Sequence, residues 1–98
     1  MTLQDQFIET TNPQLQGRIQ MAVAKAAQDI SSEAADTPNH ASRVALASRV
    51  AQSPTAYTGA FTNLLCAEGI TNGSTDAEIE SMVSAVWNTM AGQPPVGP

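Results

Sequence analysis

Hydrophobic side chains recur at helical spacing through most of the chain, and the clearest case is the segment of residues 75–91. Its apolar positions follow the i, i+3, i+4, i+7, i+8 and i+11 series of a helix with one buried stripe. We predict that this stripe lies at the centre of the core, with the other helices packed around it. It consists of Ile79, Met82, Val83, Val86, Trp87 and Met90.

Polar residues, glycine and proline mark both ends of this segment. Thr75 and Glu78 have the spacing of a capping box, in which each side chain bonds the backbone N–H of the other residue. Gly92 stands at the position of a left-handed C-terminal cap, and Pro94 and Pro95 prevent the helix from continuing. The sequence therefore predicts a helix with defined ends.

The same periodicity predicts three more helices, over residues 13–35, 40–52 and 54–67. The first and third begin with proline, which is typical of the first position of a helix. A candidate capping residue precedes each helix, and these residues are Asn12, Asn39 and Ser53. The core residues that we predict on these helices are Val23, Ile30, Phe61, Leu64 and Leu65.

A short leading helix is predicted over residues 2–10. Leu3, Phe7 and Ile8 would give it a small apolar face, but a helix of this length is marginal in isolation. Two interpretations stay open: this face packs onto its own bundle, or it docks on another chain. We therefore include the three residues among the predicted partner-binding positions.

The final segment, residues 93–98, is rich in proline. This composition excludes a helix or a regular inner strand and favours an extended, polyproline-like arm. Such an arm needs little ordering when it binds. Pro94, Pro95 and Val96 are accordingly predicted to contact a partner.

Together these patterns predict an all-α fold, because no strand pattern is found along the chain. We expect a small bundle of four main helices with a short leading N-terminal helix, forming a single domain over residues 1–92, and an extended arm over 93–98. Hydrophobic residues make up 42% of the chain but aromatic residues only 4%, so alanine supplies much of the apolar count. Because alanine buries little area, we expect a core of few large side chains that a partner would help to stabilise.

The charge balance limits the possible partners. Four basic residues and nine acidic ones give a formal net charge of -5. Binding to nucleic-acid phosphates needs a basic stripe, so we expect no nucleic-acid partner. No hydrophobic run approaches membrane-spanning length, and the first residues lack the charged region of a signal peptide. We expect no membrane partner and a protein made in a reducing cytoplasm.

The titratable residues form no catalytic or metal-binding pattern. Cys66 is the only cysteine and His40 the only histidine, and no local signal favours a nucleophilic pair between them. Cys66 falls in the apolar pattern of its helix, which is typical of a buried, inert thiol. Asp76, Glu78 and Glu80 diverge on a helix surface and compensate the helix dipole. We expect no enzymatic activity, no cofactor and no metal ion.

A family resemblance extends over about residues 18–92. It rests on an arginine followed by a Val/Ala run, on a second Arg/Val/Ala segment, on Pro54 and Phe61, and on the last helix. The matching segments are RIQMAVAKAA (18–27), HASRVALASRV (40–50), DAEI (76–79) and VWNTMAG (86–92). In these segments the chain resembles a family of small all-helical structural proteins in the virions of tailed bacteriophages.

The resemblance implies a virion structural protein without enzymatic activity, and it transfers no functional residues. We expect a homo-oligomeric subunit of the head–tail connector, or neck, that contacts other virion proteins such as portal, tail or capsid subunits. In this hypothesis the C-terminal arm holds a neighbouring ring. Two alternatives stay open, a capsid decoration (cement) protein and a free helical regulatory or DNA-binding protein.

Overall fold

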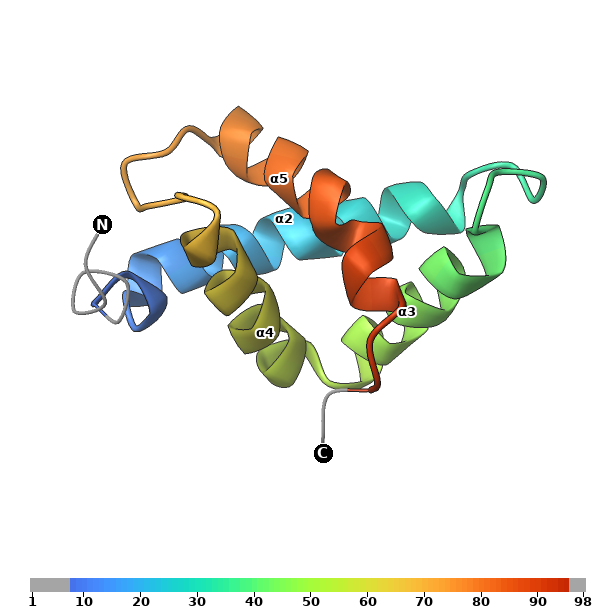
Figure 1. The fold of residues 1–98 in the computed structure, drawn as a ribbon, viewed down its shortest axis with the longest axis horizontal. Helices are drawn as coiled ribbons and strands as arrows, with labels where there is room; N and C mark the ends of the chain where they lie inside the picture. Colours follow the sequence, from blue (N-terminus) through green and yellow to red (C-terminus); the bar gives the residue numbers. More distant parts are fainter. Residues whose placement is uncertain (1–7, 96–98) are drawn as a thin grey trace.

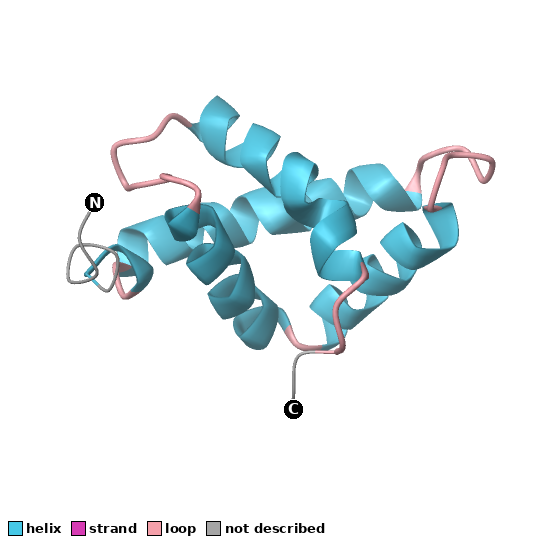
Figure 2. Ribbon diagram, viewed as in Figure 1, coloured by secondary structure: helices cyan, strands magenta, loops and turns pink. Residues whose placement is uncertain are grey.

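The computed structural model describes residues 8–95, and these residues form four main helices (Figure 1). The described part of the chain contains no strand, so the prediction of an all-α fold is confirmed (Figure 2). Residues 8–10 are helical and precede the first main helix. The main helices are α2 (Pro13–Ser31), α3 (His40–Gln52), α4 (Pro54–Ala67) and α5 (Asp76–Ala91).

Helix α2 is the longest element and contacts each of the other three main helices. In Figure 1, α5 crosses α2 on the near side, and α3 and α4 form a V whose corner is the short link between them. That corner is sharp because Pro54 begins α4 directly after Ser53. The C-terminal segment leaves α5 and runs toward the same corner.

The core lies where the four helices meet, and the predicted stripe of α5 forms much of it. Trp87 is completely buried, and its ring lies 5.6 Å from that of Phe61 on α4. Met82, Val86 and Leu64, which we predicted in the core, are partly buried and pack against its edge. The other predicted core residues are all buried, namely Val23, Ile30, Phe61, Leu65, Ile79, Val83, Trp87 and Met90.

Helix α5 begins and ends where predicted, but the conformation of its C-terminal cap differs. The Thr75 hydroxyl accepts a bond from the Glu78 N–H at 3.1 Å, and the Glu78 carboxylate accepts one from the Thr75 N–H at 2.7 Å. The Thr75 bonds hold the pKa of Glu78 below its usual value. The prediction of a left-handed cap at Gly92 is wrong, because its φ is -82° and the Gln93 N–H closes a tighter turn onto the Met90 carbonyl.

The left-handed glycine is Gly69, after α4. Its φ is 97°, and the Ile70 N–H returns to the Leu65 carbonyl while the Gly69 N–H bonds the Cys66 carbonyl. These two bonds form a Schellman motif, whose left-handed position strongly favours glycine. The motif turns the chain into the loop between α4 and α5, residues 68–75, and Ile70 of this loop is buried.

The α2–α3 junction departs from the prediction at two points. Helix α2 ends at Ser31 rather than near residue 35, where the Ser32 and Glu33 N–H groups close tighter turns onto the Asp29 and Ile30 carbonyls. The Glu33 side chain accepts from Arg43 and lies 3.1 Å from His40 Nδ1. Asn39 precedes α3 as predicted, but it is left-handed with a φ of 64° and its side chain makes no cap hydrogen bond. Of the three caps predicted for α2, α3 and α4, only that of Asn12 forms as expected, with its Oδ1 accepting from the Leu15 N–H at 3.1 Å.

Ser53 also precedes its helix without a side-chain cap bond. Proline at the first position of α4 has no N–H, and the Ser53 carbonyl still accepts the Tyr57 N–H at 3.1 Å. The corner is therefore fixed by proline geometry and backbone bonding rather than by a serine cap.

Candidate functional site

Cys66 and His40, the one cysteine and the one histidine of the chain, lie apart. Cys66 is 1% exposed near the end of α4, and burial raises the pKa of its thiol. His40 begins α3, and its Nδ1 lies 3.1 Å from Glu33 Oε1. The end of α4 and the start of α3 lie toward opposite ends of the molecule (Figure 1). The structure therefore does not assemble a Cys–His pair.

Residues 8–95 also contain no group of three or more His, Cys, Asp or Glu side chains that converge as metal ligands. In the same part of the chain no helix combines the length and the hydrophobicity needed to cross a bilayer. The features that remain as candidates for function are exposed side chains and the grooves between helices.

The predicted partner-binding residues lie near the two ends of the chain. Ile8 is 55% exposed, and Pro94 and Pro95 are exposed after α5. Leu3, Phe7 and Val96 lie outside the described residues. Residues 8–10 precede the start of α2, whereas residues 92–95 run toward the α3–α4 corner (Figure 1). The structure therefore presents two separate candidate contacts rather than one combined site.

The end of the leading segment is tied to the body of the protein. The Glu9 carboxylate accepts a bond from the Asn72 N–H at 3.1 Å, and the Gln16 side chain donates to the Thr10 carbonyl. These bonds hold residues 9 and 10 against α2 and against the loop between α4 and α5. The Ile8 side chain points into solvent. Ile8 is thus held in an exposed position by its neighbours.

All four basic side chains of the protein are engaged within the molecule. Arg18 and Lys25 on α2 pair with Asp76 and Glu80 at the start of α5, at 2.8 and 2.7 Å. The other two lie on α3. Arg43 pairs with Glu33 at 3.0 Å, and Arg49 donates to the Ala91 carbonyl at 3.4 Å with its guanidinium 6.0 Å from the centre of the Tyr57 ring.

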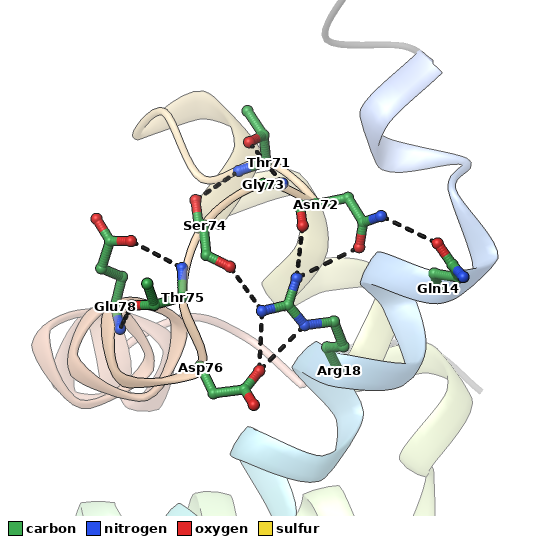
Figure 3. A network of polar contacts seen from close by, with 9 residues as sticks. All are labelled: Gln14, Arg18, Thr71, Asn72, Gly73, Ser74, Thr75, Asp76 and Glu78. Carbon is green, nitrogen blue, oxygen red and sulfur yellow. Dashed lines mark hydrogen bonds and ion pairs between the residues drawn. The ribbon is translucent and has the colours of Figure 1, made fainter.

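Arg18 is the most connected of these residues, and sequence reasoning missed its role. Its guanidinium donates to the carbonyls of Asn72 and Ser74 at 2.6 Å each, and to Asp76 Oδ1 at 2.8 and 3.1 Å (Figure 3). Asn72 also bonds Gln14 at 3.0 Å. One arginine on α2 thereby bonds several positions of the approach to α5, across more than fifty residues of sequence that no local pattern connects.

A second polar junction joins the loop after α2 to α3 and α5. The Glu33 carboxylate accepts from Arg43, which also donates to Asn88 on α5 at 2.8 Å. The Trp87 indole N–H donates to the Arg43 carbonyl at 3.2 Å. The hydrogen bond from Arg43, followed by that from His40, holds the pKa of Glu33 below its usual value.

Two grooves border α2. The groove toward α5 has a cavity of about 510 Å³, with Ala22 and Ile79 in its floor and the two α2–α5 ion pairs across it. The exposed side chain of Met21 stands on its rim.

The groove toward α3 has a different lining. It consists of two adjoining cavities that share Ala27, Gln28, Ala47 and Ala51, and one of them reaches Pro54 at the α3–α4 corner. Among the described residues, no charged side chain lines either cavity. We call this surface the uncharged α2–α3 groove.

Comparisons with family models, curated proteins and solved structures find no match to this chain. Function is therefore inferred from the two grooves, the exposed ends and the resemblance in the sequence.

Proposed function

We propose that this chain is a non-enzymatic structural subunit of a tailed-phage virion, and that it forms a ring in the head–tail connector. The observation that carries the proposal is the exposed Pro94–Pro95 segment, which leaves α5 beside the α3–α4 corner. A short segment with fixed proline torsions loses little entropy when it binds a neighbour. The resemblance to virion structural proteins supplies the biological context.

The uncharged α2–α3 groove is the surface that suits this arm best. Residues 93–98 carry no charged side chain, and no charged side chain of the described residues lines the groove. Gln20 and Gln28 on its border can donate to the free carbonyls of an extended segment. The arm of one subunit would then bind the groove of the next. Such a contact joins two different surfaces and closes into a ring when the rotation allows it.

The engaged basic residues favour this proposal over a free DNA-binding protein. Affinity for duplex DNA comes largely from lysine and arginine contacts with phosphates. Here Arg18, Lys25, Arg43 and Arg49 all have partners within the protein, and the net charge is -5. Phosphate binding would have to break these contacts.

Counting copies in purified virions tests the proposal and separates it from the alternatives. Quantitative mass spectrometry against the major capsid protein should find about a dozen copies if the subunit forms a connector ring. Hundreds of copies would show that the chain is a capsid decoration protein rather than a ring subunit. Absence from the virion would overturn the structural assignment altogether.

A matched set of variants tests the arm and the groove. Deletion of residues 93–98 should leave helicity intact and abolish incorporation into particles. Ala51→Glu places a charge in the groove at an exposed position and should have the same effect, whereas Ala45→Glu, exposed on α3 outside the groove, should not. Normal incorporation of both the deletion and the Ala51→Glu variant would rule out this contact.

A further inference from the structure

The groove between α2 and α5 is bordered by charged residues and takes no part in the proposed ring contact. Its α2 border carries Arg18 and Lys25, and its α5 border carries Asp76 and Glu80. Each cation is paired with the anion across from it, so the two pairs lie one behind the other along the groove. We call the surface made by these two borders and Met21 the α2–α5 face.

Met21 is an unusual residue for a protein surface. Its side chain is 76% exposed, and the only other large hydrophobic side chain exposed in the described residues is Ile8. Met21 lies between Arg18 and Lys25 on the same face of α2, since the three follow i, i+3 and i+7 spacing. It adjoins a groove floor made by Ala22 and Ile79, so apolar surface is flanked by charge.

The charges on this face are sorted rather than mixed. Both cations stand on one border and both anions on the other. A second copy turned over about an axis that runs along the groove would place its α2 border above the first copy's α5 border. Arg18 of each copy would then face Asp76 of the other, and Lys25 would face Glu80. The pattern is thus complementary to itself.

We propose that the α2–α5 face binds a second copy of this chain in a two-fold, isologous contact. Met21 of each copy covers the partner's groove beside Ile79, and the cation row of each copy faces the anion row of the other. The ion pairs remain solvent-accessible at their ends, with Lys25 63% and Asp76 80% exposed in the single chain. They therefore have donor and acceptor capacity left for a second partner.

The isologous contact goes beyond the proposed ring. A ring is built from contacts between two different surfaces, whereas an isologous contact joins the same surface on both subunits. The two contacts use opposite flanks of α2, so one can fail without the other. Copy number in the virion tests the ring, and pairing of the purified chain in solution tests the α2–α5 face.

Charge reversal tests the pairing directly. Lys25→Glu places a carboxylate opposite Glu80 on the other border, and Glu80→Lys places an ammonium group opposite Lys25. In a homodimer of either variant like charges meet, so the apparent dissociation constant should rise at least about tenfold over that of the full-length wild-type chain. In an equimolar mixture every reversed charge meets its opposite, and association should be restored. An intramolecular ion pair cannot be repaired by mixing two chains.

The measurement is sedimentation equilibrium of wild type, each variant and the mixture. Asp36→Lys, at an exposed loop position, changes the net charge as Glu80→Lys does and should dimerise like wild type. Circular dichroism should show both single variants folded, because both positions lie on the surface. Titration of isotope-labelled Lys25→Glu with unlabelled Glu80→Lys should shift the amide signals around Met21.

Three results would overturn the proposal. One is a wild-type chain that stays monomeric at several hundred micromolar. Another is a mixture that associates no more strongly than its components. A dimer that survives Met21→Asp as well as both charge reversals would show that another surface is used, and would equally reject the α2–α5 face.

Discussion

Helix α2 meets α5 and α3 through flanks of opposite character. Toward α5 it presents Arg18 and Lys25, and both are paired across the groove. Toward α3 it presents Ala24 and Ala27, and no charged side chain of the described residues lines the groove between the two helices. The same helix therefore supports one contact bordered by charge and another made of small, uncharged side chains.

The difference bears on what each flank can recognise. A sorted pattern of charges selects a partner with the reverse pattern, and here a turned-over copy supplies it. An uncharged groove imposes no electrostatic condition, and it admits a segment whose side chains are likewise uncharged. On both flanks the core beneath is continuous, so surface chemistry can differ while the fold is held by the same buried residues.

The largest effect should come from Trp87→Ala. Trp87 packs against Phe61 and donates to the Arg43 carbonyl, so its loss removes the largest buried side chain where α3, α4 and α5 meet. We expect a loss of about 3–5 kcal/mol in the free energy of unfolding, measured by urea denaturation. Trp87→Phe should cost less. A loss no larger than that of a surface ion pair would mean that border charges, not the core, hold α5 in place.

The next effect should come from Arg18→Met. This change removes the donors to Asn72, Ser74 and Asp76, and leaves the loop between α4 and α5 held to α2 by the Asn72–Gln14 bond. We expect about 1–2 kcal/mol of destabilisation and faster amide exchange over residues 71–76. Arg18→Lys should rescue only part of this, because an ammonium group cannot reach several acceptors in the fork geometry of arginine. Unchanged amide exchange over residues 71–76 would contradict the proposed role of Arg18 in holding this loop.

How far the sequence predicts this molecule is clear from the two ends of α5. The Thr75–Glu78 box forms as predicted, since its two bonds lie within one turn of chain. The left-handed cap appears at Gly69 instead of Gly92, because the direction that the chain takes after each helix decides whether a positive φ is needed. Hydrogen bonds within one helical turn can thus be predicted from the sequence, whereas the direction in which the chain leaves a helix depends on packing.

The candidate sites show the same division. Exposure of Pro94 and Pro95 agrees with an arm, since proline bars the helix from continuing. The sorted charges of the α2–α5 face were not predicted, because Arg18 and Asp76 are brought together only by the crossing of two helices. The contact between Glu33 and Arg43 was not predicted for the same reason, as Arg43 lies on the next helix. Sequence periodicity finds faces of helices but not which faces meet.

The α2–α3 junction and the α2–α5 face should respond to opposite ends of the pH scale. The pKa of Glu33 is lowered in the folded protein by Arg43, so its stabilisation is present above the unfolded pKa and is lost as pH falls through the folded one. The pKa of Lys25 is raised by Glu80, so its contribution is present below the unfolded pKa and is lost as pH rises through the folded one.

Urea unfolding of wild type and of Glu33→Gln at several pH values measures the loss of stability at acid pH. Wild type should lose stability between about pH 5 and pH 3, and the variant should lose less over the same interval because it has no carboxylate to protonate. The pKa of Glu78 is also lowered, so the variant will still lose some stability as the pH falls. Identical slopes for the two proteins would show that Glu33 does not contribute to the acid response.

The smallest effect on stability should come from Lys25→Gln, and it separates the two ion pairs of the α2–α5 face. The Lys25 side chain is 63% exposed and, within the described residues, bonds only Glu80, whereas Arg18 also bonds two backbone carbonyls. An exposed ion pair contributes little to folding, because solvent screens it and its long side chains lose freedom. We expect no measurable change in the urea midpoint at concentrations low enough to exclude self-association. A loss equal to that of Arg18→Met would mean that Lys25 holds α5 to α2, and the case for a role between copies would weaken accordingly.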